Sequence, residues 1–217
     1  MTDRRLLDMI HGTPWIADLL TWFEFEVARA ADGPIGSVTL TSGEPLEAIA
    51  GDGTGGCFLL VGAGDPRPVL YVGSECEGGL IARNLRDALA LVVGTSSLHD
   101  ATTIAVDQND GRDLHNFLGC TDAEIREDHP ELDANRDRLR SALGLPPVDD
   151  ALLRSLQAAA ADFRYRPLTE QGMRLRPMLA WLEKAEEAAH PEAPEPPAAV
   201  APPPRPDEPL PGQIALF

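Results

Sequence analysis

Residues 46–94, LEAIAGDGTGGCFLLVGAGDPRPVLYVGSECEGGLIARNLRDALALVVG, decide the fold, because short apolar runs alternate here with turns rich in Gly, Asp and Pro. With a preceding run, they predict strands at Val38–Leu40, Leu46–Ala50, Cys57–Val61, Val69–Gly73 and Gly79–Ala82. Spacings this short imply antiparallel pairing, since parallel strands need a crossover of about a dozen residues or more. We therefore expect a small antiparallel meander.

Helices are expected on both sides of this meander. Before it, apolar residues recur at helical spacing in a short helix around Leu6–Ile10 and in a longer helix. The longer helix should start at Thr13 and Pro14 and end near Asp32 and Gly33.

After the last strand, Asn84 is a candidate N-cap of a helix that carries Leu85, Leu89 and Val92 on one face and ends at Gly94. Helix, meander and packing helix together predict an α+β domain over residues 1–105, with a small antiparallel sheet packed by helices.

Three segments, residues 51–60, 67–72 and 80–89, are similar to the middle and end of a SUKH domain. In that superfamily a Gly-rich hairpin leads into a strand, a second strand carries a Pro-Val-Tyr-like motif, and a short strand runs into a final helix that begins near a polar cap. The resemblance covers roughly residues 46–94. Between Phe25 and Ser42 the chain departs from it, because the acidic, Gly-containing tract usual in the family is missing.

The resemblance implies a binding scaffold, best known from immunity proteins that neutralise the toxins of competing bacteria, with no general catalytic residues to carry over. An unrelated small meander is the alternative interpretation of the same strands.

Residues 106–188 form the second expected region, an acidic helical extension that packs on the domain or on a partner. Its expected helices are Arg112–Leu118, Asp122–His129, Leu132–Leu143 with Gly144 as C-cap, one from near Val148 to about Phe163, and a last one around Met178–Leu182. No repeat is evident at a solenoid period.

Residues 189–212 are mostly Pro, Ala and Glu, with almost no large apolar residue. Such a segment cannot bury enough apolar surface to offset its conformational entropy, so we expect a disordered linker. It leads to an apolar pentapeptide at residues 213–217.

The pentapeptide Gln213-Ile214-Ala215-Leu216-Phe217 resembles the peptide with which bacterial polymerases and repair proteins dock on the replication sliding clamp. In that family Leu and Phe fill a hydrophobic cleft and the Gln amide anchors the other end. The resemblance therefore implies partner binding by Gln213, Ile214, Leu216 and Phe217. Ile214 stands where Leu is commoner, and Ala215 where Ser or Asp is commoner. Another peptide-capturing partner, or docking of the pentapeptide in a groove of its own domain, are the alternatives.

The formal net charge of −17 argues against direct binding of nucleic acid, because affinity for phosphates comes mainly from Lys and Arg. A basic protein partner fits better. The 3 cysteines form no CxxC pair, and their odd number argues against a disulfide framework. Residues 1–10 lack a signal-peptide core, and no apolar run is long enough to span a bilayer. We expect a cytoplasmic protein without a membrane role.

No pattern of catalytic or metal-binding residues stands out. The Gly51–Gly56 run lacks the Lys-Ser/Thr of a phosphate loop and is followed by a strand, so it predicts a turn. The 5 histidines show no metal-ligand spacing, and no cofactor is expected. Two combinations of residues have the composition of a catalytic triad: Cys57 with His99 and Asp100, and Cys120 with His115 and Asp113. A triad is recognised by its geometry, so an enzyme ranks last among the function classes.

The sequence therefore predicts a non-catalytic, immunity-type binding protein whose acidic surface recognises a basic toxin. The alternative is a replication or repair accessory factor that is tethered to the sliding clamp through residues 213–217.

Overall fold

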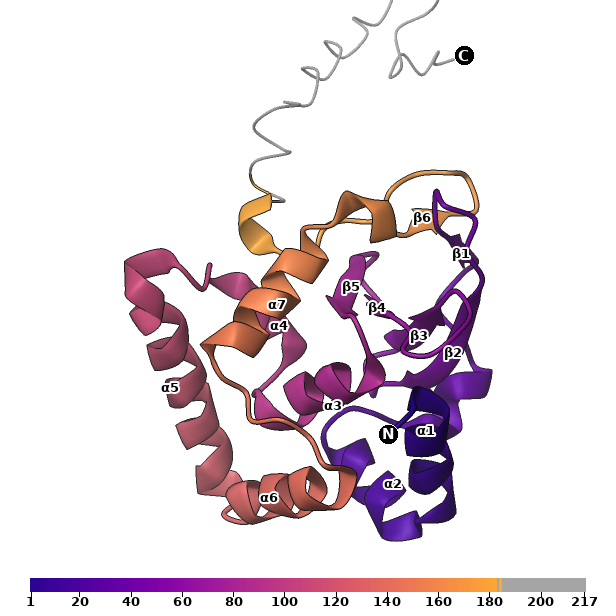
Figure 1. The fold of residues 1–217 in the computed structure, drawn as a ribbon. Coiled ribbons are helices and arrows are strands. Elements are labelled where there is room, and N and C mark those ends of the chain that lie inside the picture. Colours follow the sequence, from indigo (N-terminus) through magenta and orange to yellow (C-terminus); the bar gives the residue numbers. More distant parts are fainter. Residues whose placement is uncertain (183, 185–217) are drawn as a thin grey trace, which may run out of the picture.

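The computed structural model describes residues 1–182 and 184, and an antiparallel sheet lies at the centre of this part of the chain (Figure 1). Its strands are β2 (Leu46–Gly51), β3 (Cys57–Val61), β4 (Val69–Val72) and β5 (Gly78–Ala82), in the spatial order β2-β3-β4-β5. Adjacent strands are joined by short turns, and the register pairs Leu59 with Leu70 and Tyr71 with Gly79. The expected meander is confirmed, and with the surrounding helices it confirms the α+β class.

Both faces of the sheet are buried, which explains why β3 reads as an unbroken apolar run. Successive side chains of a strand point to opposite faces. Phe58 and Leu60 therefore join one hydrophobic cluster, while Cys57, Leu59 and Val61 join the other.

The first face is covered by α1 (Asp3–Gly12), α2 (Pro14–Trp22) and α3 (Leu85–Gly94). The predicted N-cap of α3 is confirmed, since Asn84 Oδ1 accepts a hydrogen bond from Asp87 N at 2.9 Å, and the helix ends at Gly94 as expected. Asp3 ties α1 to the rest of the domain: its buried carboxylate accepts hydrogen bonds from Arg67 N at 2.6 Å and from Leu85 N at 3.3 Å.

The prediction of a long second helix that ends near Asp32 and Gly33 is wrong, because α2 ends at Trp22. Glu24 adopts a positive φ of 59°, and the turn buries Phe25 completely in the core. Glu26 then pairs with Gly51 at the edge of β2, with N–H···O distances of 2.8 and 3.1 Å, before the 3-10 helix η1 (Val27–Ala31). Core packing and edge pairing outweigh the helical propensity of this segment.

The second face is covered by a pair of very short strands, β1 (Val38–Thr39) and β6 (Leu168–Thr169). Here the segment expected as Val38–Leu40 forms a strand, but it pairs with a strand far along the chain instead of with the meander. Leu40, Leu175 and the β1–β6 pair pack over Cys57, Leu59 and Val61.

The remaining elements are α4 (Leu98–Thr103), η2 (Gln108–Gly111), α5 (Arg112–Asp128), α6 (Leu132–Leu143), α7 (Asp150–Ala160) and η3 (Phe163–Tyr165). The two helices expected at 112–118 and 122–129 are one continuous helix, α5. Gly119 does not interrupt it, since Leu118 and Ile125 lie on one face against the main cluster. The helix at Leu132–Leu143 is confirmed with its Gly144 cap in the left-handed conformation, and α7 starts at an Asp149 N-cap.

These helices share the main hydrophobic cluster with α1, α2 and α3, through buried leucines that include Leu114, Leu139 and Leu156. α7 lies beside β5, the edge strand of the sheet. Residues 180–182 are helical where the expected last helix lies. Within the described residues, no helix has both the length and the apolar character required to cross a bilayer. The linker expected at 189–212 lies outside the described residues.

Candidate functional site: a central cavity with carboxylates on one wall

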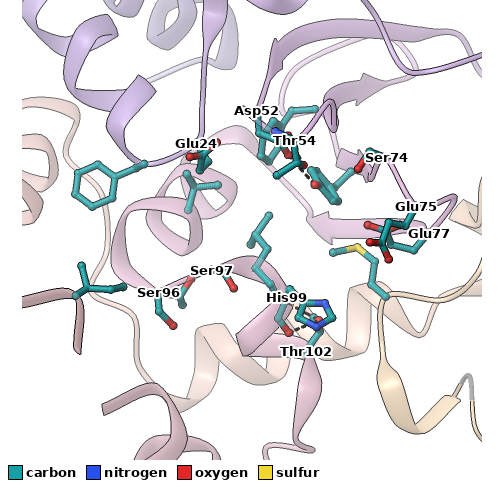
Figure 2. A pocket seen from close by; sticks show the side chains of 18 of the residues that line it. Glu24, Asp52, Thr54, Ser74, Glu75, Glu77, Ser96, Ser97, His99 and Thr102 are labelled. Carbon is teal, nitrogen blue, oxygen red and sulfur yellow. Dashed lines mark hydrogen bonds between the residues drawn. The ribbon is translucent and has the colours of Figure 1, made fainter. Parts of the chain in front are cut away.

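A cavity of about 830 Å³ opens where the turns of the sheet face α4 and the end of α2 (Figure 2). This volume lies in the range of small-molecule and peptide side-chain sites. Its sheet side carries Glu24, Asp52, Thr54, Tyr71, Ser74, Glu75 and Glu77, and the opposite side carries Ser96, Ser97, His99 and Thr102.

Asp52 is the most highly hydrogen-bonded group of the cavity. It lies in the Gly51–Gly56 turn, which confirms that this run is a turn. Its Oδ1 accepts hydrogen bonds from Thr54 N at 2.9 Å, Thr54 Oγ1 at 2.7 Å and Gly56 N at 2.8 Å. Tyr71 OH donates to its Oδ2 at 2.7 Å. The turn is thereby built around the carboxylate, which is only 5% exposed.

The protonation states of Asp52 and Tyr71 follow from the groups that surround them. Burial acts to raise the pKa of Asp52, but the hydrogen bonds from Tyr71, Thr54 and Gly56 stabilise the anion and outweigh it, so the pKa lies below its usual value. The pKa of Tyr71 is raised, first by burial and then by the hydrogen bond to Asp52 and the nearby charges of Asp52 and Glu77. Tyr71 is therefore a neutral donor, and Asp52 is an anion.

Glu77 differs from Asp52, because its Oε2 atom is buried and makes no hydrogen bond with any described residue. The residue itself is held firmly in the β4–β5 turn. Gly73 N donates to Glu77 O at 2.9 Å, and the neighbouring Gly78 N donates to Arg176 O at 2.9 Å. A methyl group on Gly73 would overlap the carboxylate of Glu77, which would have to move aside.

The other charged groups of the cavity have partners. Glu24 Oε2 accepts a hydrogen bond from Gly53 N at 2.7 Å. Arg176 lies 3.6 Å from the carboxylate of Glu75, and Arg136 forms a bidentate pair with Asp122 at 2.6 and 2.8 Å. Among the described residues, Glu24, Asp52 and Glu77 lack a cationic partner. The cavity is therefore electronegative.

Aromatic rings add an apolar surface to the same space. Phe58 and Tyr71 stand 5.1 Å apart between centroids, and Trp22 and Phe23 stand 4.6 Å apart. The wall opposite the carboxylates contributes the neutral hydroxyl groups of Ser96 and Ser97. Ser97 Oγ caps α4 by accepting a hydrogen bond from Asp100 N at 2.9 Å, and Ser96 Oγ donates one to Asp100 at 2.8 Å. The arrangement provides negative charge beside flat rings, which is the chemistry that binds organic cations.

The residues of the first candidate triad, Cys57, His99 and Asp100, do not share one site. Cys57 is fully buried in the cluster on the other face of the sheet, whereas His99 lines the cavity. Burial and the charges of Asp52 and Asp32 raise the pKa of Cys57 to about 11, so its thiol is protonated and inert.

The residues of the second candidate triad, Cys120, His115 and Asp113, are not assembled into one site either. His115 Nε2 lies 2.6 Å from Asp150, while Asp113 accepts hydrogen bonds from the side chains of Gln108 and Asn109. Cys120 is an exposed cysteine of α5. In the part of the chain that the structure describes, no group of three or more His, Cys, Asp or Glu side chains is placed to hold a metal ion.

The predicted partner-binding residues Gln213, Ile214, Leu216 and Phe217 lie outside the described residues. Sequence reasoning missed the cavity residues, above all Asp52 and Glu77. A local signal existed for Asp52, because an Asp followed by Thr at the second position within a Gly-rich run is typical of a side-chain-closed turn. Glu77 has no such signal, since its surroundings come from distant segments.

Comparison of the chain with protein-family models, with curated proteins and with solved structures finds no match. The resemblances to the SUKH superfamily and to the clamp-binding pentapeptide thus stay predictions from the sequence.

Proposed function

We propose that this protein is a non-catalytic, immunity-type binding protein of the cytoplasm that recognises a basic protein, such as a toxin, through the central cavity. The observation that carries the proposal is the set of three cavity carboxylates, Glu24, Asp52 and Glu77, without a cationic partner among the described residues. A partner that supplies positive charge would neutralise them.

The charge of the whole chain supports the same partner. A net charge of −17 attracts a basic protein over a long range and speeds its association, in a manner that weakens with added salt. The same charge opposes binding to the phosphates of nucleic acid, so a direct nucleic-acid partner is not part of the proposal.

A binding role agrees with the way the cavity hydroxyls are used. Ser96 and Ser97 both engage Asp100 at the start of α4, and Tyr71 donates to Asp52. These contacts position the walls of the cavity. Among the described residues, none of these hydroxyl groups is hydrogen-bonded to a histidine, the side chain that most often acts as general base for a nucleophile.

The direct test is co-expression with the product of the gene immediately upstream. If that product is a toxin, the chain should restore growth, and a variant that lacks residues 213–217 should protect equally well. Purified complex formation should slow as salt is raised from low to physiological strength. Protection that requires residues 213–217, or association that does not respond to salt, would contradict the proposal.

A second candidate function, tethering to the replication sliding clamp, rests on the sequence of residues 213–217 alone. A fluorescent peptide spanning residues 209–217 should bind the purified clamp of the host with micromolar affinity. The peptide with Leu216→Ala and Phe217→Ala should not bind, because such peptides concentrate their binding energy in a few apolar anchors. Equal binding of the two peptides would exclude this function.

A further inference from the structure

We infer that the cavity holds one arginine side chain of the basic partner, with the guanidinium group bound at Glu77 and stacked against the ring of Tyr71. The inference rests on the proposed function and specifies the chemistry of its ligand. It assigns Glu77 as the anchor of the site.

The carboxylate of Glu77 has an unsatisfied oxygen atom. A buried polar atom without a hydrogen-bond partner is unfavourable, and native structures rarely keep one without a use. Oε2 of Glu77 is such an atom within the described chain, and Glu77 is one of the residues that line the cavity. The turn holds it there through the hydrogen bonds Gly73 N–Glu77 O and Arg176 N–Cys76 O, both 2.9 Å. The backbone at Glu77 is therefore fixed before a ligand binds, which lowers the cost of pairing its carboxylate with a donor.

The neighbours of Glu77 indicate a positive donor. The negative charge of Glu77 helps to raise the pKa of Tyr71, and the hydroxyl group of Tyr71 already donates a hydrogen bond to Asp52 at 2.7 Å. Two carboxylates thus flank one ring. Arg176, which also lines the cavity, donates to the backbone carbonyl of Glu75 at 2.7 Å and lies 3.6 Å from the Glu75 carboxylate. Within the described residues no donor reaches Oε2 of Glu77, and a cationic ligand would both supply one and offset the local negative charge.

The rings select a guanidinium over an ammonium group. Phe58 and Tyr71 lie 5.1 Å apart and both line the cavity. A guanidinium is planar and weakly hydrated, stacks on aromatic faces and pairs with carboxylates through two parallel N–H groups. An ammonium group is strongly hydrated and loses more on entering a cavity of this kind.

The test uses the full chain, labelled with ¹⁵N, and three neutral-capped tripeptides as probes: acetyl-Gly-Arg-Gly-amide, its citrulline analogue and its lysine analogue. Citrulline has the shape of arginine without the charge. The arginine peptide should shift the amide resonances of Gly73, Glu77 and Gly78 in a saturable way at millimolar concentrations. The citrulline peptide should bind at least about tenfold more weakly, because a hydrogen bond to a charged group is worth this much or more.

Glu77→Gln should lose arginine binding by at least about tenfold while its unfolding midpoint stays at or above that of the parent, since the substitution removes an unpaired buried charge. Glu124→Gln, the same change on an exposed position of α5, is the matched control and should bind like the parent.

Several results would overturn the inference. These are equal binding of the citrulline or lysine peptide, full binding by Glu77→Gln, and marked destabilisation of Glu77→Gln, which would mean that its carboxylate has a structural partner. If the peptides fail but the chain still neutralises a basic toxin, the proposed function stands and only the arginine site falls. If the peptides bind but no basic protein does, the site stands and the proposed function falls.

Discussion

Single residues in this protein show how burial decides between reactive and structural roles. Asp52 and Cys57 are separated by only a few positions and are both almost inaccessible, at 5% and 0% exposed. Hydrogen-bond donors surround Asp52 and keep it ionised although it is buried. Cys57 lies among apolar side chains and stays a protonated thiol. The charge state at each position thus depends on which groups the fold places around it.

The lowered pKa of Asp52 predicts a specific acid sensitivity. Because its folded-state pKa lies below the ordinary value of 3.8, ionised Asp52 stabilises the fold fully above that pH. The contribution is lost as the pH falls through the folded-state value. Denaturant unfolding from about pH 5 down to about pH 2 should therefore show a steeper loss of stability in the parent than in Asp52→Asn, which does not titrate. Parallel acid profiles would contradict the assignment.

Cysteine labelling tests the burial of Cys57. Cys76 and Cys120 are exposed, whereas Cys57 is buried and its thiol has a pKa of about 11. Iodoacetamide at pH 8 should modify Cys76 and Cys120 in the native protein and leave Cys57 intact, as read by mass spectrometry of the digested chain. All of the cysteines should react after denaturation. Rapid native labelling of Cys57 would show that the second face of the sheet opens readily.

At the scale of elements, a few buried polar side chains hold the helices to one another. Arg136 of α6 donates from Nε to the Val93 carbonyl of α3 at 3.0 Å and pairs with Asp122 of α5. It thereby joins three helices and is only 6% exposed. The apolar stripes of these helices determine that they pack, and Arg136 determines how their ends meet.

Arg136→Ala should lower the free energy of unfolding by about 2–3 kcal/mol, because it removes the bidentate pair with the partly buried Asp122 and leaves the Val93 carbonyl at the end of α3 without its donor. Arg126→Ala is the matched control: Arg126 is exposed and pairs with Asp133 at 2.9 Å and more distantly with Asp122 at 3.7 Å, so a smaller change is expected. The measurement is chemical denaturation at pH 7. A similar small effect of both substitutions would show that the Arg136 pair is not structurally important.

At the scale of the whole molecule, residues beyond 105 complete the core of the residues before them. Gln157 of α7 accepts from Val106 N at 2.8 Å and donates to the carbonyls of Ala101 and Ile104 at 3.0 and 2.9 Å. It is 6% exposed and satisfies backbone groups on both sides of position 105. The β1–β6 pair likewise joins the two parts of the chain.

We therefore predict that residues 1–105 alone do not fold to a stable native state. The fragment would expose the apolar surfaces now covered by Leu114, Leu139 and Leu156, all 0% exposed in the intact protein. Its ¹⁵N-HSQC spectrum should be poorly dispersed, while a chain of residues 1–188 should give a dispersed spectrum. A dispersed, cooperative fragment 1–105 would instead make it an independent domain.

The sequence by itself determined the local structure and the α+β class. Short apolar runs between Gly- and Pro-rich turns specify antiparallel strands, and caps such as Asn84 and Gly144 specify helix ends, because these signals act between residues close in the chain. Tertiary structure alone decided the early end of α2, the β1–β6 pair and the meeting of Asp52, Glu77 and His99 around one cavity. Those features depend on the packing and pairing of segments far apart in sequence, whose energies no local pattern records.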